Sequence, residues 1–412
     1  MLHDTHKIIS DSIAAVLPDE AVLRTLTDRS FPGHVVLVAI GKAAWRMANT
    51  AHIVLGDQIG RGVVITKYDH SEGSIGNLEI VEAGHPVPDE NSVRGARRAL
   101  ELVSGLTEKD TVLFLISGGG SALFELPLEG AALDDIAALT RQLLACGADI
   151  TEINAIRKHL SAVKGGRFAA ACAPAHILSV VLSDVLGDPI DAIASGPAAP
   201  DSSTCEDVQR IIDKYALSVP EHIRSLLAQE TPKALENVET VITGNVTALC
   251  EAAAHSAAQL GYTPLVLTTT LDCEAREAGA MLASIAREIR QNGQPIKPPC
   301  AVIMGGETVV HLRGDGKGGR NQELALAAAR RIDGLEDVCI FSLGSDGTDG
   351  PTDAAGGIVT GGFAAACRAR GLSMDAALQN NDAYPLLKKM NALLMTGPTG
   401  TNVNDIAVLL CR

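Results

Sequence analysis

Polar, glycine-rich segments follow six short apolar stretches of the 412-residue chain, and they hold most of the residues that could do chemistry. The apolar stretches end at Ile40, Ile116, Leu182, Met304, Leu343 and Met395. Stretches that are apolar throughout are typical of parallel strands covered by helices on both faces. Such sheets bind ligands beyond the carboxyl ends of their strands. The sequence therefore predicts an α/β enzyme whose ligand-binding groups follow these strands.

The first two strand ends combine a cation with a glycine nest. Gly41-Lys42 follows the first strand and opens a helix, so the lysine adds a mobile cation to N–H groups that already favour anions. Three glycines follow the second strand between two serines, and they permit positive φ and a close approach of a phosphate or carboxylate. This candidate nest comprises Ser117, Gly118, Gly119, Gly120 and Ser121. A tight turn is the alternative, and no Walker A pattern occurs in the chain.

Carboxylates and a cationic helix face come next. Asp184 and Asp188 lie four residues apart around Gly187, where a carboxylate could accept a proton from a substrate hydroxyl or hold a metal ion. An Asx turn is the alternative. The spacing in residues 151–172 predicts one helix with an apolar stripe and, on its other side, a cationic face that includes Arg157 and Lys158.

The C-terminal half repeats this arrangement with more carboxylates. Glu307 follows the fourth strand, and residues 345–353 place Asp346 and Asp349 among glycines and threonines. Hard oxygen ligands suit Mg²⁺ bound with a nucleotide, although an Asp/Gly-rich turn explains the same composition. We therefore predict Asp346 and Glu307 as metal-ligating residues and Asp349 as a ligand-binding one.

Residues 314–319 match the pattern G-x-G-x-x-G, which occurs in dinucleotide-binding proteins. The preceding segment, residues 309–313, alternates between apolar and polar residues, unlike a central Rossmann strand. We favour a flexible charged loop whose anchored end carries three binding residues at the start of a helix: Arg320, Asn321 and Glu323.

The length and the charge of the chain limit the classes of protein. A chain of 412 residues usually forms two domains, and the looser pattern of residues 197–239 predicts domains at 1–236 and 237–412. There are 34 Lys and Arg against 49 Asp and Glu, a net charge of −15, which argues against nucleic acid or an anionic membrane as partner. No signal peptide or membrane segment is recognised, so we expect a cytoplasmic protein with small-molecule substrates. The nine scattered cysteines are expected to be reduced, and a homodimer is left open.

Seven motifs in this order resemble the glycerate 2-kinase family, in its bacterial and archaeal type with a C-terminal MOFRL domain. The motifs are Gly41-Lys42-Ala43-Ala44, Gly84-His85-Pro86-Val87-Pro88-Asp89, Ser117-Gly118-Gly119-Gly120-Ser121, Ser183-Asp184-Val185-Leu186-Gly187-Asp188, Gly305-Gly306-Glu307-Thr308, Gly318-Gly319-Arg320-Asn321-Gln322-Glu323 and Asp346-Gly347-Thr348-Asp349-Gly350. The resemblance implies phosphorylation of D-glycerate to 2-phosphoglycerate with ATP and Mg²⁺. It also implies a larger Rossmann-like domain, a smaller C-terminal α/β domain and an active site in the cleft between them.

Phosphoryl transfer needs cations on the transferring group and a carboxylate near the attacking hydroxyl. We predict Lys42, Asp184 and Arg320 as catalytic residues, with Asp184 as the base and Arg157 as a further cation. Which glycine-rich loop takes ATP and which takes glycerate stays open. An NAD(P)H-dependent hydroxypyruvate reductase, a label that members of this family often carry, and a non-catalytic sugar-acid binding module are the alternatives.

Overall fold

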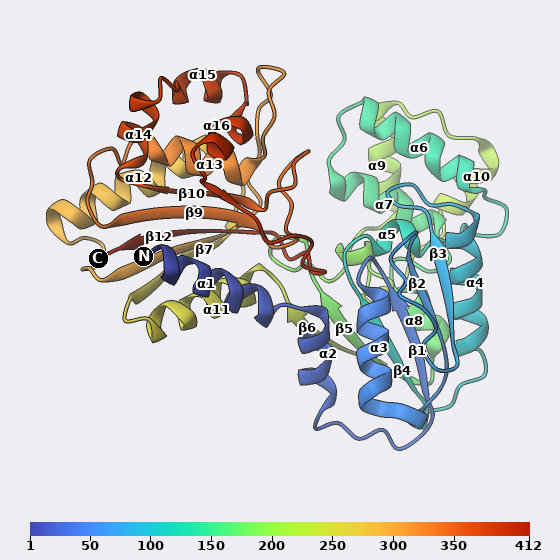
Figure 1. The fold of residues 1–412 in the computed structure, drawn as a ribbon. Helices are drawn as coiled ribbons and strands as arrows, with labels where there is room; N and C mark the ends of the chain where they lie inside the picture. The colour runs from blue at the N-terminus through green and yellow to red at the C-terminus, as the bar shows by residue number, and fades with distance from the viewer. The chain divides into compact units, whose positions relative to one another are not determined.

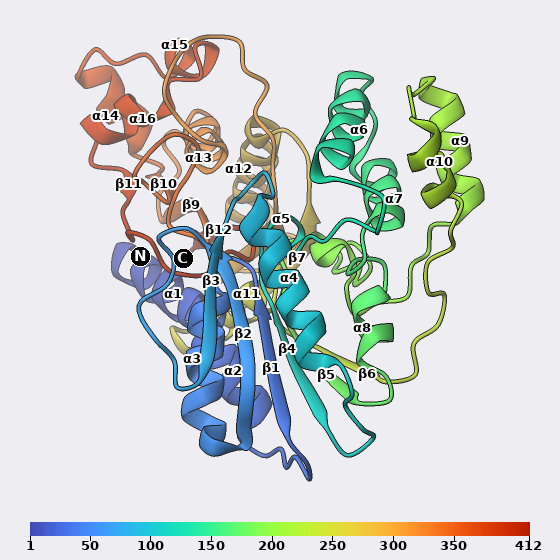
Figure 2. The same ribbon diagram turned by 90° about the vertical axis from the view of Figure 1, so that its right-hand side faces the viewer.

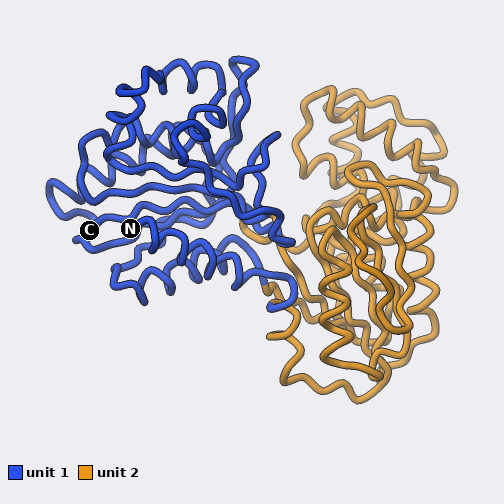
Figure 3. The backbone as a smooth tube through the Cα atoms, in the orientation of Figure 1, with its two compact units in different colours: residues 1–20, 244–412 blue, residues 21–243 orange.

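The computed structural model describes all residues, 1–412, and they form two compact units. One unit comprises residues 21–243, and the other combines residues 1–20 with residues 244–412 (Figure 3). The predicted ranges were 1–236 and 237–412, so the units differ from them in two places: residues 1–20 belong to the C-terminal unit, and residues 237–243 belong to the first unit. The first helix of the chain belongs to the C-terminal unit, and β6 (Val238–Gly244), which we expected to open the second domain, joins the first sheet next to β5.

The sheet of residues 21–243 has the strand order β3-β2-β1-β4-β5-β6 (Figure 1). Its pairings from β3 through to β5 all run parallel. In this Rossmann-type order, the chain changes its direction of winding between β1 and β4, which is where such sheets bind ligands. The bounds are β1 Val35–Ile40, β2 Ile59–Lys67, β3 Leu78–Ala83, β4 Thr111–Ile116 and β5 His176–Leu182.

Helices cover both faces of this sheet, as the continuously apolar strands predicted (Figure 2). In β1, Val36, Val38 and Ile40 pack into the core beneath α4 and α8, and the alternate residues pack into the core beneath α2 and α3. The helices are α2 Pro18–Leu26, α3 Ala44–Leu55, α4 Glu90–Val103, α5 Gly120–Leu123 and α8 Arg167–Cys172, with the 3-10 turns η1 Gly56–Gln58 and η2 Ile193–Ser195.

The single helix predicted over residues 151–172 is divided in two. The helix α7 (Ile150–Leu160) ends before Gly165 and Gly166, whose φ angles of 54° and 80° are left-handed, and α8 starts after them. The helix α7 ends because Ser161 is extended and pairs with Pro127, and the two glycines, to which positive φ is open at little energetic cost, form the turn that leads into α8.

A group of four helices has a core of its own. The helices are α6 (Leu133–Ala145), α7, α9 (Cys205–Tyr215) and α10 (Glu221–Leu227). Leu139, Ile156 and Ile212 are among the buried side chains that join them. The segment that we expected to be a domain boundary therefore folds within the first unit.

The sheet of the other unit has the order β11-β10-β9-β12-β8-β7, and β12 pairs antiparallel with both β8 and β9. Its strands are β7 Thr263–Leu271, β8 Cys300–Gly306, β9 Val338–Gly344, β10 Gly356–Thr360, β11 Leu393–Leu394 and β12 Asp405–Cys411. Its helices are α1 Leu2–Ala15, α11 Val246–Gln259, α12 Ala275–Asn292, α13 Arg320–Ala329, α14 Phe363–Ala369, α15 Met374–Gln379 and α16 Ala383–Lys389.

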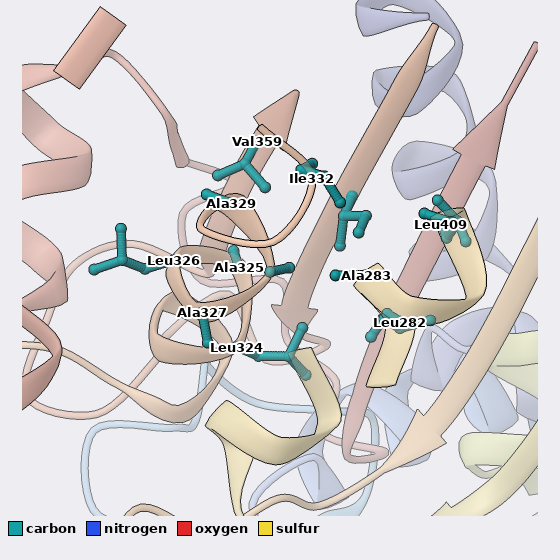
Figure 4. Packing of buried hydrophobic residues seen from close by; sticks show 14 of the residues in the cluster. Leu282, Ala283, Leu324, Ala325, Leu326, Ala327, Ala329, Ile332, Val359 and Leu409 are labelled. Carbon is teal, nitrogen blue, oxygen red and sulfur yellow. The ribbon is translucent and has the colours of Figure 1, made fainter. Parts of the chain in front are cut away.

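Small residues let α13 lie deep in this unit. Ala325 and Ala329 of α13 pack with Leu282 and Ala283 of α12 and with residues of β10 and β12 (Figure 4). A Cβ at Gly279 of α12 would overlap the carbonyl oxygen of Leu324, so the two helices approach closely only because this residue is glycine. Such packing fixes the start of α13, which carries Arg320.

The helix α1 is tied to the end of the chain. Asp4 accepts hydrogen bonds from the Tyr262 hydroxyl (2.7 Å) and the Arg412 guanidinium (2.8 Å), and both chain termini lie in this unit (Figure 1). The Thr401 hydroxyl donates to the carbonyl of Val16 at 2.8 Å. No helix of the structure has both the length and the apolar composition to cross a membrane.

Candidate active site

The ends of β1 and β4 are joined by backbone hydrogen bonds that continue beyond the paired strands. The Lys42 N–H donates to the carbonyl of Gly118 (2.9 Å), and the Ser117 N–H donates to that of Ile40 (3.0 Å). Both strands are parallel neighbours, so their tips meet at one edge of the sheet. The structure thus brings together the predicted lysine and the predicted glycine nest, at the point where the winding of the sheet reverses.

The glycines of the nest make room for charged side chains. Gly119 has a left-handed φ of 84°, and a Cβ there would lie 3.0 Å from the His85 ring and 3.3 Å from Cγ of Lys42. A Cβ at Gly118 would overlap Oδ2 of Asp184, which follows the next strand, β5. Lys42, His85 and Asp184 therefore surround the nest, and a side chain at either glycine would displace them.

The two serines of the nest serve the fold. The Ser117 Oγ accepts from the Ala43 N–H (3.1 Å) and donates to the Ile40 carbonyl (3.3 Å), and the side chain is buried. Gly41, with φ of 113°, lies directly against Ser117 because a Cβ there would overlap the hydroxyl. The Ser121 hydroxyl lies 2.8 Å from that of Ser195. Their contact with a ligand stays a prediction, and their visible role is to hold the nest in place.

His85 is the member of this cluster that sequence reasoning missed. Burial, with the nearby charges of Lys42 and Lys67, lowers the pKa of His85 below its ordinary value. A neutral imidazole can accept a proton or a hydrogen bond beside the lysine. The only signal in the sequence was the motif of residues 84–89, in which no role was assigned to the histidine.

Two neighbouring cations of α7 differ in their partners: Lys158 is paired with carboxylates, and Arg157 has an N–H group without a partner. Lys158, which we placed on an exposed cationic face, is buried and pairs with Asp201 (3.1 Å) and Asp191 (3.3 Å). Arg157 is half-buried, and its buried Nε has no hydrogen-bond partner. The fold therefore leaves one N–H donor of Arg157 for a ligand, and the role of Arg157 as an anion-binding cation stays a prediction.

Asp188 lies on a turn, with a left-handed φ of 52°.

A second cluster lies at one edge of the other sheet. Since β12 runs antiparallel to β8 and β9, its first residue Asp405 lies opposite Gly306 and Gly344, the last residues of those strands. Glu307 therefore follows β8, and residues 345–350 follow β9, at the same edge where β12 begins. The predicted residues of the C-terminal half converge there because of this topology.

Arg320 is the centre of the second cluster. Its Nε and Nη2 bind both oxygens of Asp405, at 2.5 and 3.0 Å, and its Nη1 donates to Oε1 of Glu307 at 2.8 Å. Asn404 donates to the other oxygen of Glu307 at 3.1 Å. Burial opposes the charge of Arg320, but the paired Asp405 carboxylate outweighs it and raises the pKa of the guanidinium. Arg320 therefore keeps its charge at every physiological pH. Its partner Asp405 is a residue of the cluster that sequence reasoning missed.

Three predicted binding residues support Arg320 from inside the protein. Asp349 accepts the N–H groups of Asn321 (3.1 Å) and Gln322 (2.9 Å) at the start of α13, and burial raises the pKa of its carboxyl to about 7. The Asn321 side chain accepts from the Ser342 hydroxyl at 2.5 Å. Glu323 pairs with Arg276 at 2.6 Å, and all three residues are buried. Their binding of a ligand stays a prediction, while their visible function is to anchor the helix that carries Arg320.

The loop after β9 exposes a carboxylate. Oδ1 of Asp346 accepts the Thr348 N–H at 2.9 Å, so the Asp/Gly-rich turn that we named as the alternative is present, and the residue is half-buried. The Thr399 hydroxyl donates to the carbonyl of Ser345 at 2.6 Å and fixes the same loop. One oxygen of Asp346 is used by this turn, whereas both oxygens of Glu307 are held by Arg320 and Asn404.

The G-x-G-x-x-G segment has the wrong surroundings for a dinucleotide. Residues 309–313 form no strand, so the strand that must precede such a fingerprint is missing. The loop instead packs against residues 380–383, where the Gly316 N–H donates to Asn380 (2.9 Å) and the Lys317 N–H to Asp382 (2.9 Å). Its glycines serve close backbone packing.

The fold and the two clusters define an α/β protein that carries a cation at one edge of each of its two sheets. One cluster is a cation with a glycine nest at the reversal point of a Rossmann-type sheet, and the other is an arginine held between carboxylates. Comparison with known proteins places the chain more narrowly. Residues 4–228 match the family model described as a domain of unknown function, DUF4147, and residues 300–405 match the MOFRL family.

The D-glycerate 2-kinase of Thermotoga maritima is 57% identical over 402 residues, covering 98% of this chain and 96% of that protein. The glycerate 2-kinase of Pyrococcus horikoshii is 42% identical over 426 residues, with 98% and 96% covered. The crystal structure of the Thermotoga maritima glycerate kinase superposes with a TM-score of 0.98 at 56% identity, covering 100% of this chain and 99% of that one. The chain belongs to the glycerate 2-kinase family.

The predicted alternative also appears among the relatives. A protein of Agrobacterium vitis whose name describes a hydroxypyruvate reductase is 40% identical over 409 residues, with 98% of this chain covered. This identity is lower than that of either kinase. Together with the missing strand before the G-x-G-x-x-G segment, it leaves the reductase alternative without a structural basis.

Proposed function

We propose that this protein transfers a phosphoryl group from ATP to the 2-hydroxyl of D-glycerate and forms 2-phospho-D-glycerate. The high identity to two glycerate 2-kinases over nearly the whole chain supports the substrate. The observation that carries the proposal is the arrangement of Lys42, Asp184 and the glycine nest at three adjacent strand ends. Phosphoryl transfer asks for a cation, a carboxylate and N–H groups in this relation.

Asp184 is the group proposed to orient the attacking hydroxyl and to accept its proton. Its carboxylate lies against Gly118, so it borders the nest directly. Lys42 is proposed to neutralise charge on the transferring phosphoryl group, because it borders the nest at Gly119 and its backbone is fixed by Gly118. His85 contributes an imidazole whose pKa burial lowers, and it contacts the same glycine.

Arg320 is proposed as the cation of the second cluster that binds a phosphate or carboxylate group of a substrate. A guanidinium that already binds one carboxylate through two N–H groups is held rigidly and presents a fixed array of donors. Glu307 orients the remaining edge of the guanidinium through Nη1. A substrate anion would bind there by competing with Glu307, which is half exposed and can move.

Mg²⁺ is proposed as the metal that accompanies ATP, and two carboxylates of the second cluster, Asp346 and Glu307, are candidate ligands for it. Asp346 fits, because it is a hard oxygen donor on the rim of the sheet and uses only Oδ1 in its turn. Glu307 would have to leave Arg320 and Asn404 to ligate a metal, so Asp346 is the better ligand. When bound, the ion would neutralise charge on the phosphates of ATP.

A product analysis tests the proposal. The purified protein is incubated with D-glycerate, ATP and Mg²⁺, and in parallel with hydroxypyruvate and NADH. We expect ADP and 2-phosphoglycerate in the first reaction, identified by phosphorus NMR, and no oxidation of NADH in the second. Removal of the metal with EDTA should abolish the first reaction, and Mg²⁺ should restore it. Formation of 3-phosphoglycerate would contradict the assigned position of attack, and NADH oxidation would contradict the kinase itself.

A further inference from the structure

A group of three potential metal ligands lies in the four-helix part of the first unit, and none of the three has a role in the proposed function. The donor atoms of His159, Cys205 and Glu230 all lie within 4.8 Å of one another. His159 belongs to the last turn of α7, Cys205 is the first residue of α9, and Glu230 follows α10. Three segments that are distant in the sequence thus converge on one point.

The ring of His159 is oriented as a metal ligand would be. Its Nδ1 lies 2.9 Å from the Ala155 carbonyl, which can only accept, so Nδ1 carries a proton and Nε2 is the nitrogen that can bind a metal. Nε2 faces the cluster, 3.3 Å from Oε1 of Glu230. The ring is fully buried and therefore held in this orientation. A carbonyl that fixes the tautomer in this way is the usual support of a histidine that binds a metal.

The spacing of the other donors fits a tetrahedral ion. The Cys205 Sγ lies 3.3 Å from Oε1 of Glu230, the same separation as that of the histidine nitrogen. Bond lengths of about 2.0–2.3 Å to nitrogen, oxygen and sulfur put neighbouring ligands of a tetrahedral zinc ion roughly 3.3–3.8 Å apart. Cys205 is partly buried, and the Glu230 side chain is half exposed. One side of the cluster is therefore open to an ion and to a water as the fourth ligand.

We propose that His159, Cys205 and Glu230 form a binding site for a borderline-soft divalent ion, with Zn²⁺ as its best occupant. Imidazole and thiolate are ligands that Zn²⁺ prefers and that Mg²⁺ and Ca²⁺ avoid, so the site is separate from the magnesium of the reaction. Binding forms Zn–N, Zn–S and Zn–O bonds and releases the proton of the Cys205 thiol to solvent. No electron is transferred.

In the metal-free protein the thiol is held by a hydrogen bond. The Cys205 Sγ and its backbone N–H both donate to Glu230, and burial together with this carboxylate raises the pKa of the thiol. Lys233 pairs with the same oxygen of Glu230 at 3.3 Å. Zn²⁺ must displace both the thiol proton and this lysine from the cluster, so Lys233 limits the affinity.

The bound ion would link helices that otherwise meet through their apolar core. It would tie the end of α7 to the start of α9 and to the segment after α10. Arg157, Lys158 and His159 are consecutive on α7, so the ion would stabilise the helix that presents Arg157. The consequence is a metal-dependent increase in the thermal stability of the first unit.

Titration of the chelator-treated full-length protein with Co²⁺ tests the site. We expect one equivalent of Co²⁺ to produce the visible bands of a tetrahedral ion and a thiolate-to-cobalt charge-transfer band, and one equivalent of Zn²⁺ to remove both. The melting temperature should increase with Zn²⁺ but not with Mg²⁺. Absence of the charge-transfer band in the wild-type protein would overturn the proposal.

Variants identify the ligands. Cys205→Ser should abolish the charge-transfer band and weaken Zn²⁺ binding at least 100-fold, and Glu230→Gln, at an exposed position, should weaken it at least tenfold. Cys146→Ser is the matched control, because Cys146 is an exposed cysteine of the same unit that does not belong to the cluster. It should bind as the wild type does. Lys233→Gln should bind Zn²⁺ more tightly. A band that persists in Cys205→Ser, or an equal loss in Cys146→Ser, would show adventitious binding and refute the site.

Discussion

Replacement of Arg320 by alanine separates a catalytic role of this residue from a structural one. The substitution removes the guanidinium from Asp405, which is 6% exposed, and from Glu307. Loss of one partner from a buried ion pair destabilises a protein by about 3–5 kcal/mol. Arg320 itself is about one-third exposed, so we take the lower end, about 3 kcal/mol. For a unit of this size, that corresponds to a decrease of about 6–12 °C in melting temperature.

Arg276 provides the matched control, because it loses a similar ion pair in the same unit. Its Nε and Nη2 bind Glu323 at 3.1 and 2.6 Å, and Glu323 is 2% exposed. Arg276→Ala should therefore decrease the melting temperature by a similar amount. Because Glu323 anchors α13, Arg276→Ala also reports what a weaker anchor of Arg320 costs, and we expect it to decrease kcat per folded molecule by less than tenfold.

The assay measures kcat and KM for ATP and D-glycerate at 25 °C, with the folded fraction taken from thermal melts of each variant. We expect Arg320→Ala to lose at least 100-fold in kcat/KM, which corresponds to about 2.7 kcal/mol of transition-state stabilisation. Arg320→Lys should recover only part of the loss, because an ammonium group cannot bind a carboxylate through two fixed donors. If both alanine variants lose the same fraction of activity, or if Arg320→Ala stays within tenfold of the wild type, the reasoning is refuted.

Further predictions concern single groups. Lys42→Met and Asp184→Asn should each decrease kcat about 100-fold or more, and the double variant should lose less than the product of the two; multiplicative losses would remove the pair from one transition state. The pKa of Asp349 is raised to about 7 by burial, so its contribution to stability is present below about pH 4 and is lost as the pH increases to 7. The melting temperature of Asp349→Asn should therefore increase relative to that of the wild type between pH 4 and pH 8, and a difference of equal size at both pH values would contradict this pKa. Asp89→Ala removes the side chain that accepts the N–H groups of residues 91 and 92 at the start of α4. It should destabilise the protein by about 1 kcal/mol, measured by urea unfolding. An unchanged midpoint would show that water replaces the cap.

The strands and their polar ends could be predicted because their signals are local. An apolar run such as residues 35–40 shows that a strand is covered on both faces, and the glycine and lysine after it show where the strand must end. The N-terminal cap of α4 is likewise local, because Asp89 accepts the N–H groups two and three residues further along the chain. Such features depend on near neighbours in the chain, which the sequence displays.

Features that depend on distant neighbours could not be predicted. Nothing in residues 238–244 states that this strand joins the first sheet, because its partner β5 lies about 60 residues earlier. Asn321, Glu323 and Asp349 have the side chains of a binding site, yet their partners in the fold are Ser342, Arg276 and the start of α13. Burial decides between the two roles, and burial follows from tertiary packing. Asp405 was missed for the same reason, since only the antiparallel β12 brings it to Arg320.

The attachment of α1 to the C-terminal unit has a consequence for biosynthesis. The Asp4 carboxylate binds Arg412, and β12, which lies between β8 and β9, is the last strand to be made. On the ribosome, residues 1–20 can pack on α11 first, but their full set of partners exists only after β12 has been made, 385 residues after Glu20 (405 − 20). At about 5–20 residues per second that wait lasts roughly 20–80 s. Residues 21–243 can meanwhile complete their own sheet. The first helix to be synthesised is thus among the last to reach its final contacts. Until its partners are made, its apolar residues Ile8 and Ile9 are exposed and can aggregate.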